Sequence, residues 1–499
     1  MRNRDCTFGT GGLKLTNLYT FLASKSSLWF PRICEVLSID LRSLAVFRIA
    51  IATLILVDLL TRAGDLTAHY ADEGAWPIAP ARKRLPLGGF SLHLFNGSVE
   101  FQAILFLITG AFALAMLVGY HTRLVTPIVW LLILSLHRRN PQVLQGGDHV
   151  LRVLLFWSMF LPLGSRFGVD ACRNRGSRRA SSAVRSISAA AILLQVCIIY
   201  WFAGLLKSRN TWYIQGDGVY YALMLDRYVT PIGKWLLDAN PIILKLLNYG
   251  TLGLELFGPL LALFPIVAKG PIRCGIIAAF WLFHLGMGLC LELWLFGYIC
   301  SAAWLLFIPS WVWDRLKIKS PALNRQGNKT IWARLLNGAV VFLMIYVLFW
   351  NLRTANKPLY RFFPDVINPV GYALGLDQAW GVFAGPSKKN GWFVITGQLK
   401  DGTRVNLLKP GEEVLWEKPD LVISLYESAR WRRYMRKFVK LGDPYRIHYG
   451  EYLCRRWNES HIEMEQLQSI HVYYMNQRNL ANHRVSPPKR ELLLSYTCD

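Results

Sequence analysis

Four ionisable side chains lie in or beside long apolar segments, where charge is expensive and usually has a function. Lys207 follows one apolar run, His149 opens another, and Glu255 and His284 lie inside two more. Loss of hydration disfavours a charged ammonium, so a lysine in such a place can act as a base. A histidine can stabilise charge or transfer a proton. Lys207, His149 and His284 are therefore candidate catalytic residues.

Each of these residues also has a structural interpretation. A lysine at a helix end commonly extends its amine to the membrane interface. His149 follows Asp148, which is a typical N-cap residue, so both belong equally well to a polar entry turn. His284 suits a hydrogen-bonded core position. Glu255 suits a contact with a backbone group or with a basic neighbour in the next helix.

The composition indicates a membrane protein. Of 499 residues, 53% are hydrophobic and only 17% are charged, which a soluble enzyme of this length rarely reaches. The formal net charge is +25, but much of the excess lies in short connections between apolar runs, so it does not indicate nucleic-acid binding. The nine cysteines form no CxxC pair, and we expect no metal site.

Nine apolar runs predict about nine transmembrane helices. They lie at 43–60, 99–119, 124–137, 149–163, 187–206, 242–265, 273–290, 294–309 and 331–350.

Basic residues in the connections predict the orientation. The connections 164–186 and 310–330 are rich in arginine and lysine and should be cytoplasmic. The protein is then expected in the inner (cell) membrane with its N-terminus on the cytoplasmic side, and everything after Asn351 is extracytoplasmic. Lys207 and His149 share the outer face. Basic clusters at 81–84 and 137–139 fall outside and count against this scheme.

The last part of the chain predicts a small mixed α/β domain. Two alternating segments flank Asp401-Gly402, a pair typical of a tight hairpin turn. A basic helix follows. Its aromatic residues are expected either to face lipid or, in the simpler interpretation, to pack on their own domain, and its arginines would meet phosphates in the first case. These residues are Trp431, Tyr434 and Phe438, and Arg432, Arg433 and Arg436.

The expected organisation is therefore an all-α polytopic membrane bundle with a small C-terminal extramembrane domain. We divide the chain into a cytoplasmic arm (1–37), a transmembrane domain (38–350), a linker (351–370) and the extracytoplasmic mixed α/β domain (371–499). Whether Cys454 and Cys498 pair stays open.

Several segments together resemble the horizontally transferred transmembrane (HTTM) domain, which is shared with vitamin K-dependent gamma-glutamyl carboxylase. They are FRIAIATLILVDLLTRAGDL, GYHTRL, NPQVLQGGDHVLRVLLFWSMFLPLG, FAGLLKSRNTW and FHLGMG. The resemblance covers about 38–350. It implies that Lys207, after Ala203-Gly204, is the weak base that deprotonates reduced vitamin K, and that His149 and His284 fall on two histidines of the carboxylase.

This chain departs from the carboxylase at several points. Asp148 replaces an asparagine before the histidine, which places a possible anion beside the base. Leu206-Lys207 replaces a lysine pair, and the C-terminal part does not resemble the carboxylase's substrate-binding region.

Three functions remain in competition. The first is a membrane enzyme that uses a reduced quinone, with a protein or peptide substrate on the outer face. The second is a transporter or lipid-handling protein in which Glu255 and His284 line a path. The third is a scaffold whose outer domain recruits a partner.

Overall fold

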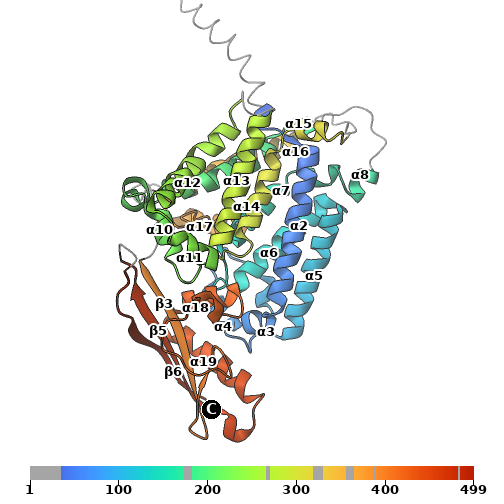
Figure 1. Cartoon of the computed structure of the whole chain (residues 1–499). Helices are drawn as coiled ribbons and strands as arrows, with labels where there is room; N and C mark the ends of the chain where they lie inside the picture. The colour runs from blue at the N-terminus through green and yellow to red at the C-terminus, as the bar shows by residue number, and fades with distance from the viewer. Residues whose placement is uncertain are drawn as a thin grey trace, which may run out of the picture.

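The computed structural model describes residues 35–173, 182–265, 270–318, 330–355, 365–385, 388–480 and 484–498. Most of the predicted N-terminal arm lies outside these residues. The described chain is mostly helical and ends in a four-stranded antiparallel sheet with helices (Figure 1). This confirms the predicted class, a helical membrane bundle followed by a small domain of strands and helices.

A helix forms at each of the nine predicted apolar runs. They are α2 (Leu41–Ala63), α5 (Val99–Val118), α6 (Thr122–Arg139), α7 (Gly146–Ser158), α9 (Ile187–Leu205), α12 (Pro241–Ala262), α13 (Pro271–Cys290), α14 (Phe296–Trp304) and α16 (Ile331–Ala355). In the described residues, five of them, α2, α5, α9, α13 and α16, are long and apolar enough to cross a membrane. Large apolar side chains are exposed on their outer surfaces, for example Leu107 at 73% and Phe342 at 64%, as expected for helices that face lipid.

The core of the bundle forms where these helices pack on one another. Helix α2 packs on α5, and α9 packs on both α12 and α16. Leu376 and Trp380, which follow α16, are buried in this same core rather than in the C-terminal domain. The chain therefore returns into the bundle before the sheet begins.

Short elements connect the long helices. Between α2 and α5 lie α3 (Leu66–Tyr70), α4 (Ile78–Lys83) and η1 (Leu92–Leu94); between α7 and α9 lie η2 (Leu163–Ser165), α8 (Val169–Arg173) and β2 (Ala183–Val184), which pairs with β1 (Ile39–Asp40). Between α9 and α12 lie η3 (Arg209–Ile214), α10 (Gly218–Leu223) and α11 (Pro231–Leu237); η4 (Leu305–Phe307) and α15 (Ser310–Arg315) follow α14, and η6 (Asp365–Ile367) and α17 (Asn368–Leu374) follow α16.

The C-terminal sheet has the strand order β4-β3-β5-β6. Its strands are β3 (Lys389–Leu399), β4 (Arg404–Asn406), β5 (Leu467–Arg478) and β6 (Lys489–Thr497). Between β4 and β5 the chain forms two helices and two short 3-10 turns. They are α18 (Ala429–Phe438) and α19 (Asp443–Asn458), and η7 (Val422–Leu425) and η8 (Glu463–Glu465). The predicted hairpin is confirmed: β3 and β4 pair antiparallel across Asp401-Gly402, and Gly402 has a positive φ of 89°.

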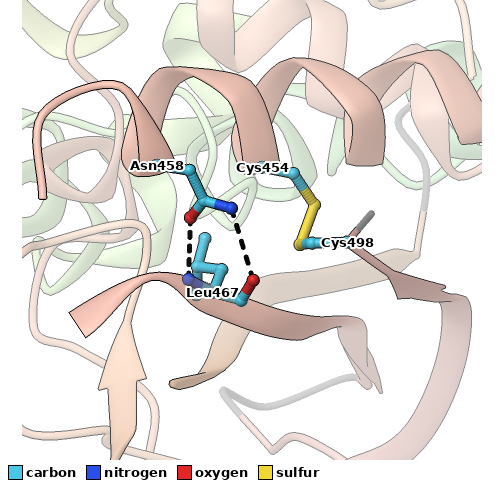
Figure 2. Close-up of a disulfide and its surroundings, with 4 residues drawn as sticks. All are labelled: Cys454, Asn458, Leu467 and Cys498. Atoms are coloured by element: carbon cyan, nitrogen blue, oxygen red, sulfur yellow. Dashed lines mark hydrogen bonds between the residues drawn. A yellow bond between two sulfur atoms is a disulfide. The ribbon is translucent and has the colours of Figure 1, made fainter. Parts of the chain in front are cut away.

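A disulfide closes the C-terminal domain. Cys454 of α19 is bonded to Cys498, which follows β6, across a sequence separation of 44 (Figure 2). Beside it, Asn458 accepts a hydrogen bond from the Leu467 amide at 2.7 Å and donates one to the Leu467 carbonyl at 3.4 Å. These contacts fix the end of α19 on the first residue of β5.

The aromatic face of α18 packs within the protein and not on lipid. Trp431, Tyr434 and Phe438 are buried in one cluster with residues of the α2–α5 connection, including Ala75 and Trp76. The aromatic residues thus pack within the protein, both on their own domain, including Phe393 and Tyr449, and on the bundle. In Figure 1, α18 lies between the bundle and the sheet, near α3 and α4.

The end of the bundle next to α18 carries the connections that were predicted to be outside. Tyr434 donates to the Ala75 carbonyl at 2.9 Å, and Arg432 pairs with Glu292 at 2.6 Å. Helices α8 and α15 lie at the opposite end (Figure 1). In the basic cluster at 137–139, which opposed the scheme, Arg139 is fully buried and donates to the Trp76 carbonyl, and Arg138 pairs with Asp377 at 2.7 Å. These cations have structural partners within the protein.

Candidate functional site

Lys207 is held at the C-terminal end of α9 by a carboxylate from another helix. Its Nζ lies 2.5 Å from Oε2 of Glu255 on α12, and it donates a longer bond of 3.4 Å to the Ala203 carbonyl. It also lies 4.6 Å from the centre of the Trp212 ring. Lys207 and Glu255 are each 5% exposed. The lysine is therefore a buried, paired group and not an amine extended to the membrane surface.

A small residue on α9 allows this pairing. A Cβ at Gly204 would lie 2.8 Å from Leu256 Cδ2 and 3.5 Å from Glu255 Cβ. Small residues let membrane helices approach closely, because no side chain separates the backbones. The contact between α9 and α12 that brings Glu255 to Lys207 thus passes at Gly204, where a larger residue would require the Leu256 side chain to move.

His284 is part of a chain of buried polar groups on α13, α9 and α14. Its Nε2 lies 2.7 Å from the Tyr200 hydroxyl, and the Trp304 indole donates to the same hydroxyl at 2.9 Å. The His284 Nδ1 is buried and has no hydrogen-bond partner among the described residues. The ring is therefore oriented from one side and has an unused polar atom on the other.

Lys207, Glu255 and His284 line one cavity of about 270 Å³. We call it the apolar cavity, because nearly all its other lining residues are apolar. They include Ile199, Ala203, Leu223, Leu247, Phe283, Met287, Leu291, Phe296, Val382 and Phe383. A cavity with apolar walls and a few convergent polar groups is the usual form of a small-molecule site.

His149 lies in a second cavity of about 410 Å³, which we call the basic cavity. Its lining includes Arg227, Arg432, Arg433, Arg436 and Tyr228. The structure therefore does not place the three candidate residues in one cavity, although Phe296, Val382 and Phe383 line both. His149 Nδ1 lies 3.3 Å from an Arg152 nitrogen, and Arg152 is bound to Asp377 at 3.1 Å.

Asp148 is not beside Lys207. Its side chain accepts a hydrogen bond from the Gln145 amide at 2.6 Å, which caps the start of α7, and pairs with Arg62 at 2.8 Å and Arg430 at 2.6 Å. We expected a carboxylate next to Lys207, and one is present, but it is not that of Asp148. Glu255 supplies that anion, from a helix that is distant in sequence.

Asp148 belongs to a buried ion network that links the bundle to α18. Asp58 and Arg62 of α2 pair at 2.7 Å, and Arg430 binds both Asp58 and Asp148. His137, Asp58 and Asp148 offer ligand atoms within 4.8 Å of one another. The two carboxylates are already neutralised by two guanidinium groups, so the cluster is a network of ion pairs in character.

The sequence interpretation missed two groups of residues. Arg227 and Tyr228 of the basic cavity lie in the connection between α10 and α11, which gave no signal of a site. The alignment of Arg430 with Asp58 and Asp148 joins residues that are 372 and 282 positions apart. The basic character of α18 was the available signal, but its partners required the tertiary fold.

A comparison with family models identifies the family of the transmembrane part. The HTTM domain model matches residues 37–311, and this domain is shared with vitamin K-dependent gamma-glutamyl carboxylase. No curated protein and no solved structure matches the chain. The matched region includes Lys207, His149 and His284 but ends before the C-terminal domain. Because the match covers more than half of the chain, this protein belongs to the HTTM family and is an integral membrane protein with several spans.

Proposed function

We propose that this protein is a membrane enzyme that binds a lipid-soluble hydroquinone in the apolar cavity and uses Lys207 as its base. The observation that carries the proposal is the joint position of Lys207, Glu255 and His284 in the wall of one apolar cavity. An apolar ring system suits these walls, and its hydroxyl groups suit the few polar atoms. A hydroquinone supplies an acidic hydroxyl and two electrons when bound.

The pair of Lys207 and Glu255 can supply a neutral amine. Their charged atoms lie 2.5 Å apart, so a proton can move from Nζ to Oε2. The buried pair loses the hydration of both charged groups, which offsets part of their mutual attraction. With the proton on Glu255, Lys207 presents a lone pair to an acidic hydroxyl in the cavity.

His284 is suited to orient the ligand. If Tyr200 donates its hydroxyl hydrogen to Nε2, the neutral ring carries its own hydrogen on Nδ1, the atom without a partner among the described residues. That N–H can be donated to a ligand oxygen. His149 lies beyond Phe296 and Phe383, in the basic cavity, so we assign it a supporting role there and no contact with the ring.

The orientation proposed for this site is that of the sequence interpretation, with nine spans and the C-terminal domain outside. The Cys454–Cys498 disulfide supports it, because structural disulfides persist in oxidising compartments. Both cavities lie near the C-terminal domain, since α18 supplies residues to the basic cavity. The site would then be reached from the outer half of the membrane.

The test uses the purified full chain in nanodiscs. A naphthoquinone should quench tryptophan fluorescence saturably, because Trp212 and Trp380 line the apolar cavity. The Lys207→Met variant should keep that binding within about threefold but lose the oxidation of naphthohydroquinone by oxygen. Lys245→Met on α12, which removes an exposed lysine, is the matched control and should behave as wild type.

Two results would contradict the proposal. One is quenching that does not saturate, since the cavity would then not hold the ring. The other is a Lys207→Met variant that oxidises the hydroquinone at the wild-type rate. Saturable binding without any oxidation in the wild-type protein would instead favour the transporter or lipid-handling function.

A further inference from the structure

The basic cavity gathers four arginines around one phenol. Arg227 and Tyr228 come from the connection between α10 and α11, and Arg432, Arg433 and Arg436 come from α18. Arg436 donates to the Tyr228 hydroxyl at 2.5 Å, and the guanidinium groups of Arg227 and Arg432 lie within 5.3 Å and 5.7 Å of its ring centre. The positive charges therefore converge on a single space.

The cavity has little negative charge to balance them. Glu292 pairs with Arg432, but no described carboxylate lies within the 4.0 Å ion-pair distance of the guanidinium groups of Arg227, Arg433 or Arg436. None of the described lining residues is an aspartate or a glutamate. The Arg227 Nε is buried and lacks a hydrogen-bond partner among the described residues. The cavity thus has four guanidinium groups, one paired with a carboxylate, and at least one buried donor without an acceptor among the described residues.

The pKa of the Tyr228 phenol is shifted by these positive charges. Burial alone raises the pKa of this phenol, yet the charges of Arg436, Arg227, Arg433 and Arg432 lower it below its ordinary value. A group that stabilises a phenolate here stabilises other oxyanions in the same place.

We propose that the basic cavity is a binding site for the phosphate group of a ligand. Arginine binds phosphate through two parallel hydrogen bonds, and a phosphate offers three terminal oxygens to several arginines at once. A carboxylate satisfies one such fork and leaves the other donors unpaired. Three of the four arginines lie outside the residues matched by the HTTM model, so the site is a feature of this chain's own C-terminal domain.

The ligand is either a small phosphate ester or a lipid with a terminal phosphate. The basic cavity shares Phe296, Val382 and Phe383 with the apolar cavity, which places an apolar volume next to the phosphate site. Both sources present the same oxyanion, and the experiment separates them. The site does not depend on the proposed use of a hydroquinone, because none of its arginines lines the apolar cavity.

Binding is measured on the full chain in phosphatidylcholine nanodiscs, with inorganic phosphate and dodecyl phosphate as probes and acetate as the weaker comparison. Arg436→Gln is the main variant, because Arg436 is exposed and its loss leaves the buried contacts of α18 intact. Arg227→Gln is the second variant. Lys440→Gln, an exposed residue just after α18 and outside the lining, is the matched control of equal charge change.

Saturable binding that Arg436→Gln and Arg227→Gln each weaken about tenfold or more, with Lys440→Gln unchanged, is expected. If inorganic phosphate binds as tightly as dodecyl phosphate, the ligand is a small ester; if only dodecyl phosphate saturates, it is a lipid. The proposal is overturned if neither probe saturates, if acetate binds as tightly as phosphate, or if the arginine variants match the control while their unfolding temperatures equal that of wild type.

Discussion

Arg430 should be the residue that fastens the C-terminal domain to the bundle. It lies on α18, is 3% exposed, and donates to Asp58, to Asp148 and to the Val143 carbonyl at 2.9 Å. In Arg430→Met, two buried carboxylates share the single cation of Arg62. Breaking a buried ion pair by removing one partner costs about 3 to 5 kcal/mol. We expect a loss of this size in the free energy of opening α18 away from the bundle.

Hydrogen exchange measured by mass spectrometry tests this loss directly. A decrease of about 3 to 5 kcal/mol in opening free energy corresponds to exchange that is about 10² to 10⁴ times faster. The amides of α18 should show this acceleration in Arg430→Met. Arg456→Met is the matched control, because Arg456 pairs with Glu427 on the surface, where both side chains are more than half exposed. Such a pair is worth at most about 1 kcal/mol, or about fivefold in exchange.

A compensating variant separates charge from packing. Adding Asp58→Asn to Arg430→Met leaves one arginine and one aspartate, Arg62 and Asp148, at 2.8 Å. Much of the lost protection of α18 should return, since no carboxylate is then left without a cation. The reasoning is refuted if Arg430→Met and Arg456→Met exchange equally in α18, or if the double variant is no better protected than the single one.

Three further predictions concern stability. Lys207→Met should lower the unfolding temperature in nanodiscs because it leaves the buried Glu255 carboxyl without its partner. A second change to leucine at Glu255 should restore most of the loss, and equal single and double variants would contradict this. Reducing the Cys454–Cys498 bridge, or replacing Cys498 with serine, should lower the free energy of unfolding by about 4 kcal/mol, because the loop between these residues is no longer closed. The serine variant should show a lower unfolding temperature with or without reductant, and the wild type should show it only with reductant. Burial lowers the pKa of His69 to about 3, so between pH 7.5 and 5 the unfolded chain binds a proton at this residue and the folded chain does not. Lowering the pH from 7.5 to 5 should therefore lower the free energy of unfolding by about 2 kcal/mol through His69. His69→Phe should lack this part of the loss.

The sequence predicted those elements whose signals are local. The nine apolar runs, the Asp401-Gly402 hairpin and the basic helix at 429–438 all depend on neighbours within a few residues, and each formed as a helix or hairpin. The orientation of the aromatic face of α18 was harder, because a lipid-facing and a core-facing stripe have the same spacing. Burial of Tyr434 and Phe438 against Ala75 settled it through contacts that span more than 350 residues.

The candidate site was predictable as a list of residues but not as an arrangement. Lys207 and Glu255 were both identified from the cost of charge in an apolar segment, yet their pairing depends on how α12 crosses α9 at Gly204. His149 was a candidate beside Lys207 because both were placed at the outer face of the membrane. It lies instead behind Phe296 and Phe383, which come from segments that no local pattern connects to it.

If both cavities bind ligands as proposed, their shared wall links the two binding equilibria. Phe296, Val382 and Phe383 face both spaces, so a ligand that displaces one of these side chains changes the shape of the neighbouring site as well. Linkage is reciprocal: whatever factor one ligand imposes on the affinity of the other is returned in full. With such a partition, occupancy of one cavity would change the affinity of the other through these three side chains.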